Sequence, residues 1–156
     1  MRRRLANPLH LRRLGLALVF AGALLAGLAT GLRDRLAPGT GRHSATYFLD
    51  VAGWLLAVAG ALIEARVGGL LLTAGQPAAR RRALLFTVTG LGAALAACAT
   101  IPLRSSGASA TSLRAALAAI LVGGFGVGLG GLATLGWFYG GRYAARRIER
   151  MGEDDW

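Results

Sequence analysis

The residues of this chain most able to carry chemistry are two acids inside a long apolar stretch. Asp50 and Glu64 lie in the segment from Tyr47 to Gly75, and the other apolar runs of the sequence contain no acidic residue. At ~100° per residue, fourteen positions return a helix to nearly the same face, so both carboxylates project from one side. A charge at the membrane midplane costs ~2.5–3.5 kcal/mol, so two such acids indicate either ion pairs between helices or a path for protons or cations.

The helix face that carries the two acids is otherwise made of small residues. These are Gly53, Ala57 and Ala61, whereas bulky aliphatic side chains occupy the opposite face. Small residues in membrane helices mark contacts between helices, and bulky aliphatics suit lipid. We therefore expect Asp50 and Glu64 to face the inside of a bundle, where arginines of other segments can pair with them. The candidate partners are Arg104 and Arg114 for Asp50, and Arg12, Arg13 and Arg146 for Glu64.

The other reactive residue types are too few and too scattered for catalysis or metal binding. The one cysteine, Cys98, lies in an apolar run, and both histidines, His10 and His43, lie outside the apolar runs. No pair of His, Cys, Asp or Glu has the spacing of a metal site, and no serine has both a base and an acid to complete a catalytic set. The sequence predicts no enzyme activity, no cofactor and no metal.

The composition indicates an integral membrane protein. The chain has 156 residues, of which 54 % are hydrophobic, and its mean hydropathy is +0.52. A soluble domain of this size has no core large enough for so much apolar surface. We predict an all-α, single-domain bundle of four transmembrane helices with a tail at residues 142–156. The expected helices cover about 14–32, 46–66 (or on to 75), 83–103 and 115–141.

The beginning of the chain also has features of a secretory signal peptide. Five arginines precede the first apolar run, and a small-residue site lies near residue 29. The run is longer than the ~7–15 apolar residues of a typical signal, which favours a retained helix. Cleavage of residues 1–29 stays open at this point.

The basic residues indicate membrane topology rather than nucleic-acid binding. All 18 are arginine, and they flank the apolar runs. With both termini cytoplasmic, twelve arginines lie on the inner side and five on the outer side, and Arg66 is assigned to neither side. The excess of arginine on the inner side favours this orientation. The absence of lysine suggests a GC-rich bacterial genome. We therefore expect a multi-pass protein of the bacterial cytoplasmic membrane, in contact with the lipid bilayer and not with nucleic acid.

The last apolar run is rich in glycine, which indicates close helix packing. Its glycines form two stripes about 130° apart around a helix. One stripe is Gly123, Gly126 and Gly130, and the other is Gly124, Gly128 and Gly131. We expect these stripes to pack against the small residues of other helices, Ala23, Gly27 and Gly31 in the first and Gly92 and Ala96 in the third, or against a second copy.

Two hypotheses for function follow from these features. The favoured one is a non-catalytic structural or accessory protein that packs through its Gly/Ala faces, as a homo-oligomer or in a larger membrane complex. The alternative is a small transporter or channel, coupled to protons or cations, that uses Asp50 and Glu64.

Overall fold

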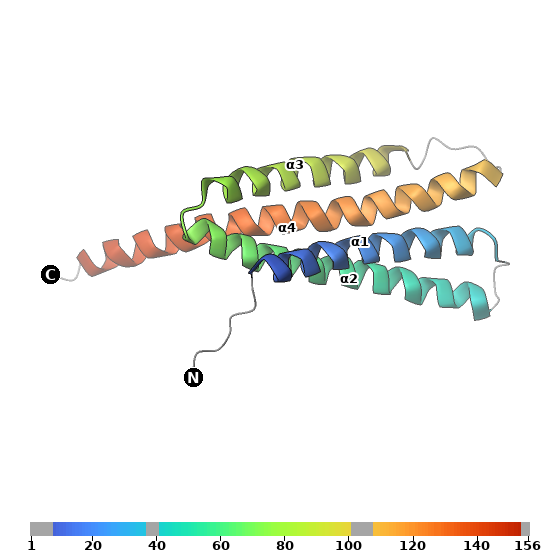
Figure 1. The fold of residues 1–156 in the computed structure, drawn as a ribbon, viewed down its shortest axis with the longest axis horizontal. Helices are drawn as coiled ribbons and strands as arrows, with labels where there is room; N and C mark the ends of the chain where they lie inside the picture. Colours follow the sequence, from blue (N-terminus) through green and yellow to red (C-terminus); the bar gives the residue numbers. More distant parts are fainter. Residues whose placement is uncertain (1–7, 37–40, 101–107, 154–156) are drawn as a thin grey trace.

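The computed structural model describes residues 8–36, 41–100 and 108–153, and these residues form four helices and no strand. The helices are α1 (Pro8–Arg33), α2 (Gly41–Thr73), α3 (Pro77–Thr100) and α4 (Ala108–Glu153) (Figure 1). Each of the four is long and apolar enough to cross a membrane. The predicted class, an all-α protein with four membrane-length helices, is confirmed.

The second helix takes the longer of its two expected forms. It continues past Glu64 to Thr73, and Gly75 then adopts a positive φ of 76°. The amide of Gly75 donates to the carbonyl of Leu72 at 3.0 Å, and that of Gln76 donates to Leu71 at 3.2 Å. These two bonds form a Schellman cap, which satisfies carbonyls at the end of the helix. Pro77 then begins α3, at a position where the missing amide hydrogen has no cost.

The last helix continues beyond its membrane-length part. That part covers Thr111–Tyr143, close to the expected 115–141, and α4 continues without a break through the tail to Glu153. Its 46 residues extend about 69 Å at 1.5 Å per residue, more than twice the ~30 Å of a hydrocarbon core. Glycines lower helix stability without forcing an end, and the Ala, Arg and Glu residues that follow are strong helix formers. Figure 1 shows the C-terminal part of α4 projecting beyond the other helices.

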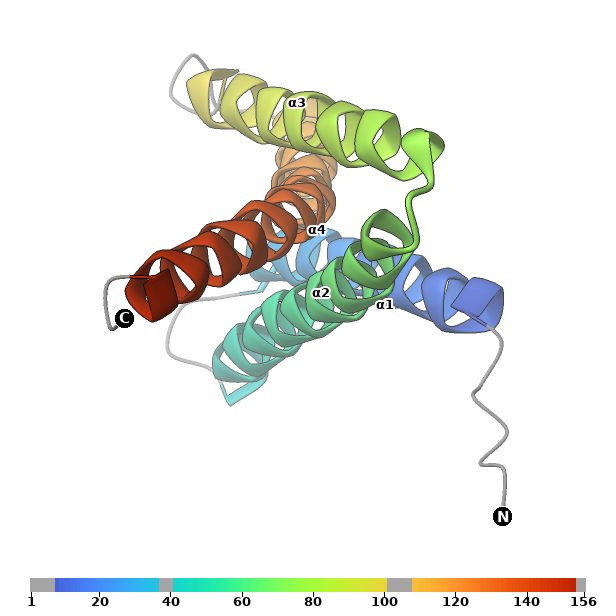
Figure 2. The same cartoon turned by 90° about the vertical axis from the view of Figure 1, so that its left-hand side faces the viewer.

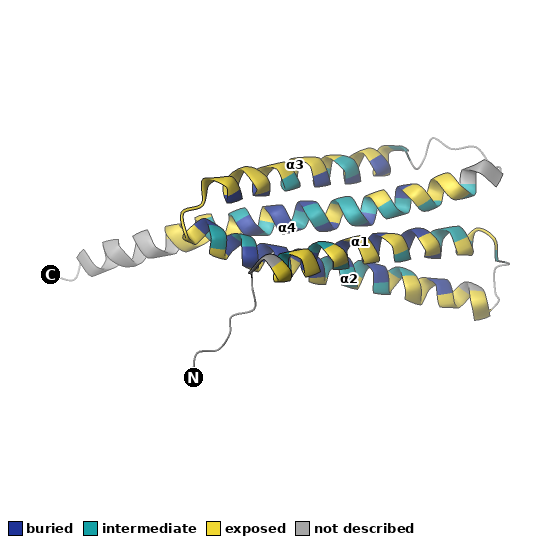
Figure 3. Cartoon of the chain, viewed as in Figure 1, coloured by how far each residue is buried: buried dark blue, intermediate teal, exposed yellow. Residues whose placement is uncertain are grey.

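Three of the helices form the core, and the fourth is peripheral. Helices α1 and α2 pack against each other and against α4, whereas α3 packs mainly on α4 (Figure 2). Ala26, Ala57 and Val122 form the centre of the core, and Trp54 packs beside them. Buried residues lie on the sides of the helices that face one another (Figure 3). The fully buried side chains are thus no larger than valine, and most of the large aliphatics face outward.

Reciprocal pairs of glycines set the contact between α1 and α2. A Cβ atom on Gly53 would lie 2.7 Å from the carbonyl oxygen of Gly22, and one on Gly22 would collide with the carbonyl oxygen of Gly53. Gly15 and Gly60 have the same relation. Gly15 and Gly22 are seven residues apart, as are Gly53 and Gly60. The expected contact faces did not include Gly15, Gly22 or Gly60, although this shared spacing is visible in the sequence.

The two glycine stripes of α4 face different neighbours. Cβ atoms on Gly124 and Gly131 would lie 2.7 and 2.6 Å from carbonyl oxygens of α3, and one on Gly128 would lie 2.8 Å from Leu91. The other stripe meets α1 and α2: the nearest atoms belong to Ala23 for Gly123, Val19 for Gly126 and Glu64 for Gly130. The two stripes therefore allow α4 to pack closely against α3 on one side and against α1 and α2 on the other.

The expected contact face of the third helix was wrong. Gly92 and Ala96 are exposed, and nothing lies within 4 Å of a Cβ atom added at Gly92. Gly90 instead lies against the backbone of Gly124 and Gly128. Two residues correspond to ~200° around a helix, so Gly90 and Gly92 are on nearly opposite sides. The apolar pattern of α3 did not reveal this rotation, because both sides carry small residues.

Candidate functional site

Glu64 lies inside the bundle and pairs with an arginine of α1. Arg12 Nε is 3.3 Å from Glu64 Oε2, and the two side chains are only 16 % and 9 % exposed. Arg12 was one of the three partners expected for this acid. Its guanidinium also lies 5.7 Å from the centre of the Phe86 ring of α3. One residue of α1 thus touches both α2 and α3.

The second carboxylate oxygen of Glu64 has a different environment. Oε1 is buried and has no hydrogen-bond partner among the described residues. Glu64 belongs to the lining of a cavity of about 30 Å³, to which Gln76, Arg82 and Thr134 also contribute. The Thr134 hydroxyl donates to the Gly130 carbonyl oxygen at 2.8 Å. A cavity of this volume and polarity has room for one or two water molecules.

Asp50 pairs with Arg33, which was not among its expected partners. Arg33 Nη2 is 3.2 Å from Asp50 Oδ2, and Arg33 Nε donates to the Thr46 hydroxyl at 3.3 Å. The guanidinium also stacks over the Tyr47 ring, 4.1 Å from its centre. The expectation failed because Arg33, which we assigned to a loop, is the last residue of α1. Since α1 and α2 are antiparallel neighbours, the end of one lies beside the start of the other (Figure 1).

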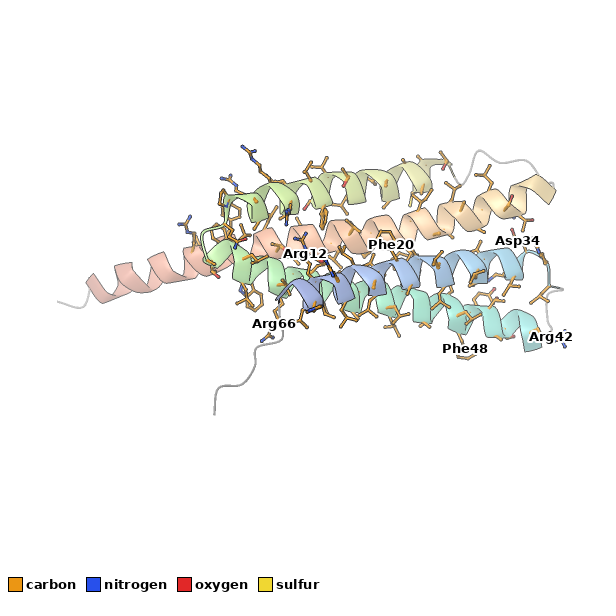
Figure 4. The ribbon with its side chains drawn as sticks, viewed as in Figure 1. Arg12, Phe20, Asp34, Arg42, Phe48 and Arg66 are labelled. Carbon is orange, nitrogen blue, oxygen red and sulfur yellow. The ribbon has the colours of Figure 1, made fainter. Side chains whose placement is uncertain are left out.

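The other expected partners of the two acids have different positions. Arg114 of α4 lies 3.5 Å from Asp34, in the turn after α1, and Arg13 is exposed. Arg104 and the side chain of Arg146 lie outside the described residues. Arg66, two residues after Glu64, points away from the other helices (Figure 4). The three ion pairs of the described part of the chain therefore join α1 to α2 at both ends and α1 to α4 at one end.

The two acids share a helix face but do not form one site. They are fourteen residues apart, which is about 21 Å along a helix. Between them lie Gly53, Ala57 and Ala61, and both alanines are at most 1 % exposed. Val19 and Val122, the largest fully buried side chains, lie in the same region. In the described core, no buried polar side chain bridges Asp50 to Glu64.

Among the residues that the structure describes, no other nucleophilic or metal-binding side chains come together. Cys98 is exposed and unpaired with another cysteine. In residues 8–36, 41–100 and 108–153, no three His, Cys, Asp or Glu side chains gather as a metal site would require. The arrangement can hold helices together at Glu64 and Asp50 and can hold water at Glu64.

No protein-family model matches this sequence, and neither the curated proteins nor the solved structures include one that matches it.

Proposed function

We propose that this chain is a non-catalytic membrane protein that serves as a structural or accessory subunit. The proposal rests on one observation: the inward-facing charged side chains form ion pairs between helices. Arg12 with Glu64 and Arg33 with Asp50 join neighbouring helices, and an apolar centre of small residues separates the two pairs. Charged groups that bridge helices in a membrane stabilise a fixed arrangement.

Association with other membrane helices is part of this proposal. The small residues Gly92 and Ala96 lie on an exposed side of α3, a helix that has one main neighbour within the chain. Small residues allow two membrane helices to approach closely. A transmembrane helix of another subunit or of a second copy can therefore pack on this side.

The first test is the mass and composition of the complex extracted gently from its native membrane. We expect an assembly larger than one chain, and we expect Gly92→Leu to shift it toward the monomer because the leucine separates the packed helices. Gly136→Leu is the matched control, since Gly136 is also open and exposed but lies on α4. A monomer in the native extract, or an assembly unchanged by Gly92→Leu, would contradict association through α3.

A second candidate function is transport of protons or cations, favoured by the unpartnered Oε1 atom of Glu64. The small polar cavity beside it is a place where a proton can reach the carboxylate. On this hypothesis, Glu64→Gln reduces ion flux into protein-containing vesicles at least tenfold, and Asp50→Asn reduces it as well. The flux is measured with a pH-sensitive dye at fixed membrane potential. Proton flux equal to that of empty vesicles in the unaltered protein would rule out proton transport.

A further inference from the structure

A basic hollow lies where α2 ends, α3 begins and α4 passes beside them. Its volume is about 680 Å³, within the range of ligand sites in proteins. Three arginines line it, Arg80 and Arg81 from α3 and Arg142 from α4. The end of α2 and the turn after it contribute Leu72, Gly75 and Gln76 to the lining. The hollow shares only Gln76 with the lining of the Glu64 cavity, and the ion pairs described above do not include any of its arginines.

The charge of this hollow is uncompensated among the described residues. No described acidic side chain lines it, and none of the three arginines has an ion pair with a described side chain. The guanidinium of Arg142 lies 4.9 Å from the centre of the Phe138 ring, which holds it beside the hollow. Three positive charges in one concave surface attract an anion with several oxygen atoms, such as a phosphate group.

The start of α3 also lines the hollow through Pro77, and the first turn of this 24-residue helix contains no acid. The N-terminus of a helix carries a partial positive charge and its C-terminus a partial negative one. Because the end of α2 lines the same hollow through Leu72 and Gly75, the two helix ends offset each other. The three arginines therefore supply the attraction for an anion.

The rest of the lining is apolar and aromatic. Leu72, Leu84, Phe138 and Tyr139 contribute to it. The apolar span of α2 ends at Thr73 and that of α3 begins at Pro77, so the hollow lies where the membrane-spanning segments meet water. A ligand with both an anionic group and an apolar part fits this combination. Basic pockets between transmembrane helices at this level bind anionic lipid headgroups.

We propose that this hollow binds the headgroup of an anionic phospholipid. The phosphate contacts Arg80, Arg81 and Arg142, and the start of an acyl chain lies along Leu84 and the aromatic side chains. The lipid then connects the peripheral helix α3 to α4. No ion pair in the described part of the chain joins these two helices.

The test compares lipid binding by the purified full chain in detergent, using native mass spectrometry. The probes are phosphatidylglycerol and phosphatidylcholine with the same acyl chains. We expect phosphatidylglycerol to bind at least tenfold more tightly, and the triple variant R80Q/R81Q/R142Q to lose at least tenfold of that affinity, since each arginine near the surface contributes to attraction. The variant R13Q/R42Q/R66Q is the control: it removes the same charge from exposed arginines that do not line the hollow.

The outcomes of this test separate the proposal from simpler explanations. An equal loss of affinity in both triple variants would overturn it, because the lipid would then respond to net charge alone. Displacement of phosphatidylglycerol by millimolar inorganic phosphate would overturn it as well, because it would identify a site for a free anion instead of a lipid. If the first triple variant lacks the helical circular dichroism of the unaltered protein, R80Q/R81Q, which changes only exposed residues of α3, carries the same test.

Discussion

Replacing Glu64 by leucine is expected to destabilise the bundle by about 3 kcal/mol. The change leaves the Arg12 guanidinium without its carboxylate partner, on a side chain that is 16 % exposed in the unaltered protein. Removing one member of a buried ion pair costs roughly 3–5 kcal/mol, because an uncompensated charge remains. We expect the lower end of this range, since Arg12 lies near the start of α1 and its long side chain can extend toward water. Unfolding by sodium dodecyl sulfate, followed by circular dichroism, measures the change.

The double variant Arg12→Leu/Glu64→Leu shows whether the pair itself is needed. Both charges are then absent, so we expect most of the lost stability to return, as when buried ion pairs are replaced by apolar residues. Arg66→Leu is a control at an exposed arginine of α2, with an expected change below about 0.5 kcal/mol. A double variant as unstable as Glu64→Leu would show that Glu64 has a role besides pairing with Arg12.

Gly53→Leu is expected to separate α1 from α2, at a cost on the order of 3 kcal/mol or more, because it places a side chain where two backbones touch. A Cβ atom at this position would lie 2.7 Å from the carbonyl oxygen of Gly22 and 3.0 Å from the amide nitrogen of Ala26. Both are backbone atoms, which cannot move aside as a flexible side chain does. Inserting extra atoms into a close-packed contact typically costs ~1–3 kcal/mol, and backbone collisions lie at the upper end. The same unfolding titration gives the magnitude.

Gly136→Leu is the matched substitution at a glycine of α4 with open space around it. It should leave stability unchanged or raise it slightly, because leucine favours helix more than glycine does.

Cross-linking gives an independent measure of the contact between α1 and α2. In a chain that carries Cys98→Ser, cysteines introduced by Arg33→Cys and Asp50→Cys should be joined by a short thiol-reactive cross-linker. Adding Gly53→Leu to this variant should prevent the cross-link. A Gly53→Leu variant that stays stable and cross-linked would contradict the close glycine contact.

The membrane-length helices were predictable because they depend on local properties. Apolar runs of about 20 residues, prolines at their ends and arginines beside them define a helix whatever its neighbours are. The shared face of Asp50 and Glu64 followed from helical periodicity alone. The sequence left two ends open for the helix that carries Glu64, and the cap at Gly75 decided for the later one.

The sequence by itself determined the class of this protein, its four helices and the small-residue faces through which helices can meet. Only the tertiary structure decided which faces meet: Gly22 with Gly53, Gly90 with α4, and Arg33 with Asp50. The physical reason is that a Gly/Ala-rich helix has several sides made of small residues, and packing through any of them gives similar stability. The choice among them depends on all the helices together, and so do the positions of the cavity at Glu64 and the basic hollow at Arg142.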